Sequence, residues 1–302
     1  MDVLVEAVDA YVAEPLAGDA LAAAGMPVGS TARMAALLTA TMYLGTLFNY
    51  LVCATLSYVV FFRMYPQCLH DPEAVHVRPG QIRRELLWSL GSMPVVVLLT
   101  APIYVLHGLG YSRLYRSPGA FGYGYLALSA ALFVLFTDLG VCWIHRLLHQ
   151  PPLYAWVHQR HHSMVRPTPF SAMSFNPIDG FVVSLPYHLF AFALPLNTYL
   201  YFFAFVAIQW WCVSVHDRVY LPTRWLGKFV LGAQHHADHH VYFKVNYSQY
   251  LTVFDWLFGT LKADDPRVRN RELAKKDEAR AEAVALTSAP SSAVDARAAK
   301  RA

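Results

Sequence analysis

Several apolar stretches with few charged residues in this sequence are long enough to cross a lipid bilayer. A membrane-spanning helix needs about 20 predominantly apolar residues. Three stretches reach this length, at 34–62, 86–109 and 122–144, and a longer one at 178–215 is divided by Pro195 and Asn197. We interpret the longer one as a helical hairpin. The sequence therefore predicts an all-α integral membrane protein with about four to five transmembrane or hairpin helices.

Composition supports a membrane protein. Charged residues make up 15% of the chain, whereas soluble domains carry about 25%. The four cysteines lie far apart and outline no disulfide framework. The net charge is only +4, without a run of lysine and arginine, so we expect no nucleic-acid partner.

The distribution of charge predicts the orientation. The first 30 residues contain five acids and no Lys or Arg, which is not the pattern of a secretory signal. The loop after the first stretch holds Arg63, Arg78, Arg83 and Arg84, and basic loops stay cytoplasmic. We therefore expect four segments: a lumenal segment at 1–33, two spans with their loops at 34–121, a histidine-rich catalytic domain at 122–261, and a polar tail at 262–302 without a fold of its own. Two arginines in the next loop, at 113 and 116, fit this orientation less well.

Eleven of the fourteen histidines fall between His145 and His240. Within each cluster the spacing is i, i+4 or i, i+3, i+4, which puts the side chains on one face of a helix. The predicted topology brings the clusters to the same membrane face, as a cytosolic cap. The candidate ligands are His145, His149, His158, His161, His162, His216, His235, His236, His239 and His240.

So many imidazoles predict two metal ions. Protonated imidazoles repel one another, and burying them without a metal is costly. Imidazole suits iron, zinc, copper and nickel, and a redox-active pair beside a membrane suggests oxygen activation on a lipid. Other histidines have simpler interpretations: His107 as a hydrogen-bonded core residue, and His70 and His76 as solvated loop residues. His188 lies within an apolar stretch, where a polar side chain is a functional candidate.

The clusters read HRLLH at 145–149, HQRHH at 158–162 and HHADHH at 235–240. They resemble the three histidine boxes of the sterol desaturase and fatty acid hydroxylase superfamily, which are integral membrane di-iron oxygenases. The flanking sequences PTPF at 167–170, NPIDGF at 176–181, SLPYH at 184–188 and DWLFG at 255–259 are most similar to the C-5 sterol desaturases, or lathosterol oxidases.

The resemblance implies that the boxes and His216 hold two iron ions, with His235 as an extension of the third box. Zinc can replace iron in a purified sample. Because the family lacks bridging carboxylates, Asp217 and Asp238 are expected to orient imidazoles. Thr168 and Asn176 are candidates for polar contacts near the second box, with turn formation as the simpler alternative. His188 is expected either to bind metal or to hydrogen-bond a substrate hydroxyl. No catalytic residue beyond the metal ligands is expected.

The implied reaction introduces the C-5(6) double bond into a 7-ene sterol with O2. The sequence has no flavin or nicotinamide fingerprint, and the family takes electrons from cytochrome b5 and its NADH-dependent reductase. Basic residues near the site would form the docking face for cytochrome b5, unless they only set the topology: Arg146, Arg160, Arg166, Arg224 and Lys228. The family also implies the endoplasmic reticulum membrane, contact with membrane lipid, and an active site on the cytosolic face.

The sequence alone does not exclude several other functions. The ligands do not distinguish desaturation from hydroxylation, so a sibling lipid oxygenase is the nearest alternative, such as a sterol C-4 methyl oxidase or a fatty acid hydroxylase. A histidine-rich membrane metal transporter, a bis-histidine haem protein and an inactive relative are further alternatives. A transporter is expected to hold its ligands at mid-membrane, whereas these clusters lie at the ends of the predicted spans.

Overall fold

The computed structural model describes residues 2–69, 77–164, 166–219, 226–262 and 275. The predicted tail beyond Lys262, together with His70, His76 and Arg224, lies outside the described residues, apart from Lys275.

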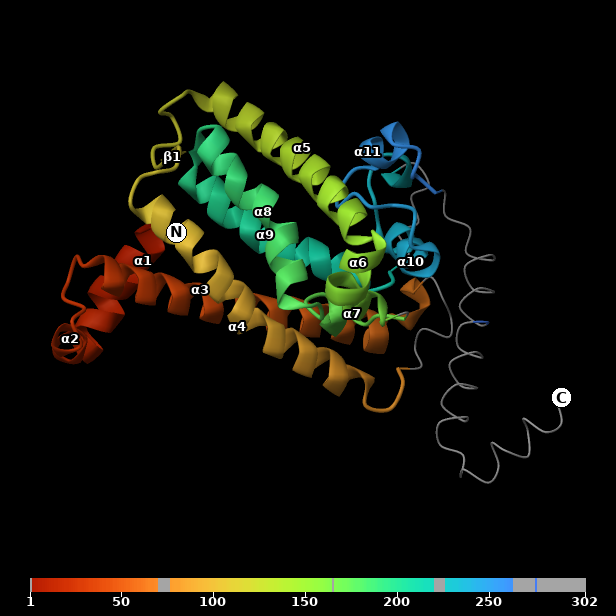
Figure 1. Cartoon of the computed structure of the whole chain (residues 1–302), viewed down its shortest axis with the longest axis horizontal. Helices are drawn as coiled ribbons and strands as arrows, with labels where there is room; N and C mark the ends of the chain where they lie inside the picture. Colours follow the sequence, from red (N-terminus) through yellow and green to blue (C-terminus); the bar gives the residue numbers. More distant parts are fainter. Residues whose placement is uncertain (1, 70–76, 165, 220–225, 263–274, 276–302) are drawn as a thin grey trace. The chain divides into compact units, whose positions relative to one another are not determined.

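Long helices dominate the structure and confirm the predicted all-α class. Within the described residues, four helices are long and apolar enough to cross a membrane: α3 (Thr31–Ser57) with its π-helical continuation η2 (Tyr58–Met64), α4 (Gln81–Gly108), α5 (Tyr123–Leu148) and α9 (Thr198–His216). The helix α8 (Pro177–Ala193) precedes α9. It packs against α4 and α5, while α3 packs against α4 and α9 (Figure 1).

The predicted hairpin at 178–215 is confirmed, with α8 and α9 as its two arms. The chain turns through β2 (Leu196–Asn197), which pairs in parallel with β1 (Leu114–Tyr115). Asn197 starts the second arm, because its side-chain oxygen accepts hydrogen bonds from the amides of Tyr199 and Leu200. Its side-chain amide donates to the carbonyl oxygens of Tyr115 and Arg116. This turn is therefore tied to the loop before α5.

Short elements gather at the end of the bundle where α5 and α9 finish (Figure 1). After α5 come α6 (Pro151–Leu153), η5 (Tyr154–His158) and α7 (Gln159–His162). After α9 come η7 (Leu226–Lys228), α10 (Ala233–Tyr242) and α11 (Thr252–Leu257). Two further 3₁₀ turns are η3 (Pro66–Cys68) and η6 (Pro169–Ser171).

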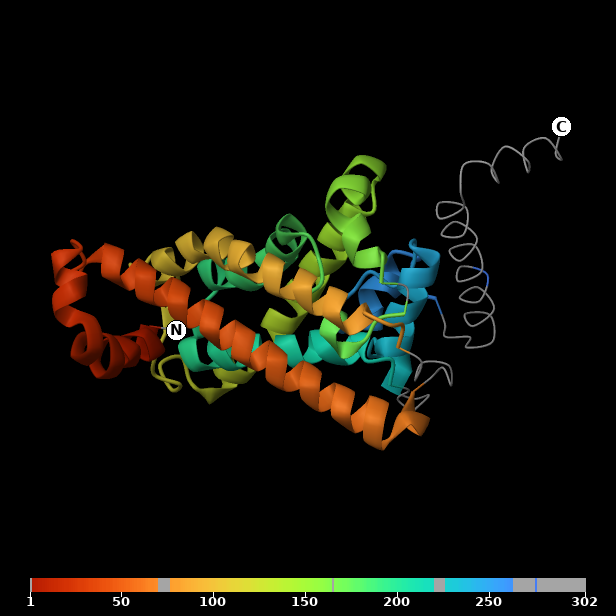
Figure 2. The same cartoon turned by 90° about the horizontal axis from the view of Figure 1, so that it is seen from below.

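The N-terminal segment lies at the opposite end from α10 (Figures 1 and 2) and forms α1 (Asp2–Val8), η1 (Asp9–Ala13) and α2 (Glu14–Ala23). Its acids pair with the arginines found there. Arg33 forms ion pairs with Asp9 and, at 2.6 Å, with Glu14, and Arg116 lies 2.6 Å from Glu6. Carboxylates of the N-terminal segment therefore offset the charges of Arg33 and Arg116.

The segment 166–174 contains no α-helix, only the 3₁₀ turn η6, and it is buried against α3, α4 and α9. Backbone that is buried in a membrane protein needs internal hydrogen-bond partners, and side chains of α3 and α4 supply them. The Phe170 carbonyl oxygen accepts from the Tyr50 hydroxyl at 2.7 Å and from the Ser89 hydroxyl at 3.0 Å. The Met173 carbonyl accepts from Ser92. This segment joins the second histidine box to α8 and is fixed to two spans.

The two donors to Phe170 provide a test of this anchoring. Tyr50→Phe or Ser89→Ala alone leaves the carbonyl with one partner, so each is expected to be mild. The double variant leaves a buried carbonyl without these donors and should lower the free energy of unfolding by about 1–3 kcal/mol beyond the sum of the single effects. Thermal unfolding in detergent measures this non-additivity. Strict additivity would show that the shared carbonyl is not the point of attachment.

Candidate metal centre

Nine imidazoles from distant parts of the chain converge in two groups. Within each group the potential ligand atoms all lie within 4.8 Å of one another. The larger group contains His145, His149, His158, His162 and His239, and the smaller group contains His161, His216, His236 and His240. All except His149 and His236 are buried. The structure thus brings together nine of the ten histidines predicted as ligands.

The second and third boxes each contribute side chains to both groups. In the second box, His158 and His162 enter the larger group, and His161 turns to the smaller one. In the third box the division is reversed, because His236 and His240 enter the smaller group and His239 turns to the larger one. The i, i+4 pair of each box therefore serves one group, and the i+3 residue serves the other.

The distances within the groups fit nitrogen ligands around a cation. In the larger group, the Nε2 atoms of His145 and His158, of His149 and His239, and of His149 and His162 are 3.1 Å apart. In the smaller group, the corresponding separation is 3.0 Å for His236 and His216. Nitrogens bound at about 2.1 Å to one ion stand about 3.0 Å apart at right angles and about 3.4 Å apart in tetrahedral geometry. Both groups therefore suit metal coordination.

Hydrogen bonds fix the tautomers of several of these imidazoles. The Nδ1 of His145 lies 2.9 Å from the Tyr247 carbonyl, and that of His239 lies 2.7 Å from the Val245 carbonyl. In the same way, His216 Nδ1 lies 2.6 Å from the Cys212 carbonyl. Because a carbonyl oxygen only accepts, each Nδ1 must carry the proton, and each Nε2 keeps its lone pair for a metal.

Asp179 is a carboxylate that contacts a clustered imidazole, and its role was not predicted from the sequence. The Nδ1 of His158 donates to Asp179 at 2.8 Å, and both side chains are buried. His145 and His158 therefore face each other through two Nε2 lone pairs. Such an arrangement is repulsive unless a cation lies between them. Asp179 is the acid in the NPIDGF sequence at 176–181, which was the signal available.

Two further buried acids hold the loop that orients His145 and His239. Asp138 of α5 accepts hydrogen bonds from the amides of residues 249, 250 and 251 at 2.7–2.9 Å. Asp255 of α11 accepts from the amides of Tyr247 and Ser248 at 2.8 and 2.9 Å. Neither role was predicted from the sequence, although an acid within the third apolar stretch was a visible signal for Asp138.

Burial favours the neutral form of three imidazoles outside the spans, those of His149, His239 and His240. Desolvation, reinforced by the nearby His158, lowers the pKa of His149 to about 3. Desolvation and neighbouring imidazoles also hold the pKa values of His239 and His240 well below the ordinary histidine value. Neutral imidazole is the form that binds metal, so the electrostatics of the site favour coordination at neutral pH.

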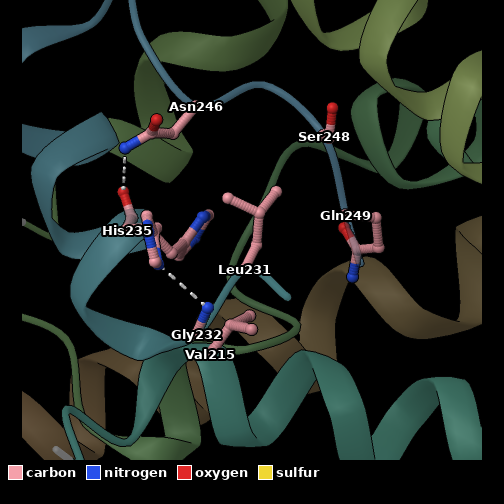
Figure 3. A pocket seen from close by; sticks show the side chains of 8 residues that line it. Val215, Leu231, Gly232, His235, Asn246, Ser248 and Gln249 are labelled. Carbon is pink, nitrogen blue, oxygen red and sulfur yellow. Dashed lines mark hydrogen bonds between the residues drawn. The ribbon is translucent and has the colours of Figure 1, made fainter. Parts of the chain in front are cut away.

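His235 is the predicted ligand that joins neither group. Its Nδ1 accepts a hydrogen bond from the Gly232 amide at 3.2 Å, and its carbonyl accepts one from Asn246 at 3.0 Å (Figure 3). The ring closes the first turn of α10 and lines a small cavity of about 10 Å³ beside His236. The structure therefore places His235 in a capping position, next to the ligand groups.

His188 lies among the helices, outside both groups. Its Nδ1 lies 2.9 Å from the Tyr201 hydroxyl, which is also 3.4 Å from His107 Nε2. All three side chains are buried, and they join α4, α8 and α9. This contact supports the interpretation of His107 as a hydrogen-bonded core residue.

The polar candidates near the second box form local structural contacts. Thr168 donates to the Glu85 carboxylate and caps η6. Asn176 caps α8 by accepting from the Ile178 amide at 2.9 Å. A substrate contact by either residue stays a prediction.

Asp217 and Asp238, the two carboxylates expected to orient imidazoles, contact other groups in the structure. Asp217 accepts from the Val219 amide at 2.9 Å and from the Ser57 hydroxyl at 3.2 Å. Asp238 lies 3.5 Å from the Lys262 ammonium. Orientation of imidazoles by these two residues remains a prediction.

The basic residues proposed as a docking face differ in exposure. Arg160 and Lys228 are exposed, whereas Arg146 and Arg166 are partly buried. Arg160 stacks over the Trp88 ring at 4.7 Å from its centroid, so part of its charge is held against α4.

The fold and the site define an all-α membrane protein whose histidine-rich centre is compatible with bound metal. Its residues 130–260 match the model of the fatty acid hydroxylase family. No solved structure matches the chain.

Three relatives define the family more closely. A Delta(7)-sterol 5(6)-desaturase of Gibberella zeae is 38% identical over 224 residues, covering 74% of this chain and 68% of the relative. Human lathosterol oxidase is 35% identical over 268 residues, covering 87% and 85%. A Delta(7)-sterol 5(6)-desaturase of Schizosaccharomyces pombe is 38% identical over 238 residues, covering 77% and 68%. The chain therefore belongs to the sterol C-5 desaturase family of oxidoreductases.

Asp179→Asn tests the contact with His158. Loss of the charged acceptor should weaken metal affinity by about 10–100-fold, measured by chelator competition with elemental analysis. Glu85→Gln is a matched control, because the buried Glu85 carboxylate accepts hydrogen bonds from Thr168 and Gln81. Equal affinity in the two variants would contradict the role of Asp179.

Acid should destabilise the metal-free protein. The unfolded chain takes up protons on histidine below a pKa of about 6.5, whereas His149 in the folded state does so only near its pKa of about 3. Stability is therefore lost as pH falls from about 6.5 towards 3, by up to about 1.4 kcal/mol per pH unit for each such histidine. Unfolding temperatures at pH 7.5 and 5.5 measure the effect, and His149→Gln should reduce it. A metal-free protein equally stable at both pH values would refute the prediction.

Proposed function

We propose that this protein introduces the C-5(6) double bond into a 7-ene sterol, using O2 and two iron ions held by the two histidine groups. The supporting observation is the convergence of nine imidazoles into groups of five and four. The named activities of the relatives point to the same reaction. The reaction removes one hydrogen each from C-5 and C-6, and O2 is reduced to two waters with two further electrons and two protons.

The larger group would hold one iron ion and the smaller group the other. Iron bound there would supply the redox chemistry that activates O2 towards an unactivated C–H bond. The protein's own residues position and enclose the site. Asp179 and the carbonyls of Val245 and Tyr247 fix three imidazoles, and Asp138 and Asp255 hold the loop that carries those carbonyls. Such positioning matters because a displacement of about 1 Å can lower a rate about 100-fold.

We also propose that the site faces the cytosol of the endoplasmic reticulum membrane. Basic residues at the metal end include Arg63, Arg84 and Arg160, and positive charge favours the cytoplasmic side. At the other end, Arg33 and Arg116 are paired with acids. Cytochrome b5, reduced by its NADH-dependent reductase, would then deliver electrons from the cytosol, with the exposed Arg160 and Lys228 among its contacts.

The location of the ligands argues against a metal transporter. A transporter holds its substrate near the middle of the membrane, whereas here the ligands lie at the last turns of α5 and α9 and on the short helices that follow them.

Turnover of a defined sterol tests the proposal. The iron-loaded protein in vesicles, given a 7-ene sterol, O2, NADH, cytochrome b5 and its reductase, should form a product two hydrogens lighter with the ultraviolet absorbance of a 5,7-diene. His145→Ala and His161→Ala each remove one ligand from a different group and should abolish turnover. Tyr111→Phe, an exposed change at the other end, should not.

Two outcomes would overturn the assignment. A product heavier by one oxygen atom would indicate a sibling hydroxylase. Absence of turnover by a protein shown to contain both iron ions would exclude the desaturase. Elemental analysis distinguishes iron from zinc in the purified sample.

A further inference from the structure

The short helix α11 has two opposite faces. Val253, Trp256 and Leu257 follow i, i+3, i+4 spacing and are exposed, with Trp256 at 68%. Asp255 and Thr252 lie on the other side and are buried. Between residues 251 and 261, Asp255 is the only charged side chain, and it is turned inward to the amides of Tyr247 and Ser248. The exposed face of α11 is therefore uncharged and apolar.

This face continues an exposed stripe on α5. Leu128, Leu135, Trp143 and Leu147 are exposed at intervals of seven, eight and four residues, which places them along one side of that helix. The Trp143 ring packs against Phe258, directly after α11, with centroids 5.1 Å apart, and α11 contacts α5. An exposed apolar stripe on a helix that crosses a bilayer faces lipid, so the stripe leads from the lipid-facing side of α5 to α11.

We infer that α11 lies in the interfacial layer of the bilayer at the metal end, with Val253, Trp256 and Leu257 against lipid. Tryptophan is enriched at this depth, where its ring meets apolar chains and its N–H meets water. The lack of charge on this face suits lipid better than a water-soluble partner. The occupant is therefore the same bilayer that α5 spans.

The buried face of α11 links this lipid contact to the metal centre. Asp255 holds the Tyr247 amide, and the Tyr247 carbonyl accepts the hydrogen bond from His145 Nδ1. A helix seated on the bilayer surface would thus fix the height of the larger ligand group above the membrane.

Site-specific photocrosslinking tests the inference. p-Benzoylphenylalanine is placed at Trp256, and in a second variant at Leu257, in the full-length protein in phosphatidylcholine vesicles that contain an alkyne-tagged phosphatidylcholine. The same group at Leu135 of α5 is the positive control, and at the exposed Lys244 it is the control for a site in water. Metal content and size-exclusion profile establish that each variant is folded.

After illumination, positions 256 and 257 should form lipid adducts as readily as position 135 and several-fold more than position 244. Lipid labelling at both positions no higher than at Lys244 would overturn the inference. Crosslinked dimers in place of lipid adducts would also overturn it, because the face would then be covered by a second copy of the chain. Since the readout is lipid labelling, its result is independent of sterol turnover.

Discussion

Imidazole lone pairs that face each other at about 3 Å are the constraint on which the rest of this structure depends. His145 and His158 each have Nδ1 committed to an acceptor, which leaves two Nε2 lone pairs 3.1 Å apart in a buried space. Two lone pairs held this close in a buried space repel each other. A metal cation between the nitrogens would relieve this repulsion, and the metal would then be a structural part of the cap as well as the source of the proposed chemistry.

Three buried acids on different helices hold the clustered imidazoles in position through hydrogen bonds. Asp179 on α8 acts directly on His158, whereas Asp138 on α5 and Asp255 on α11 act through the backbone of residues 247–251. The centre is consequently tied to spanning helices and to the inferred lipid contact of α11. Hydrogen bonds of this kind, from metal ligands to carboxylates and carbonyls, set ring orientation and tautomer. The position of the centre is thus determined by the helices that cross the membrane.

The sequence predicted which histidines cluster more successfully than it predicted their surroundings. Helical spacing marked the boxes, but it did not show that His158 and His162 serve one group while His161 serves the other, since that depends on where α10 lies. His235 has the same local sequence pattern as its neighbours, yet the first turn of α10 directs its Nδ1 to Gly232. Asp179 was missed because its contact with His158 spans 21 residues and a buried segment that contains no α-helix.

By itself, the sequence determined the apolar spans and the division of the hairpin at Pro195 and Asn197. It also showed enough clustered imidazoles for two metals. These features could be predicted because hydropathy and helical periodicity are local properties. Only the tertiary structure decided how nine imidazoles divide into two groups, which acid supports them, and that α11 carries an uncharged exposed face beside α5. Those outcomes depend on the packing of distant segments, and no local pattern records the direction in which a side chain points once its helix is packed.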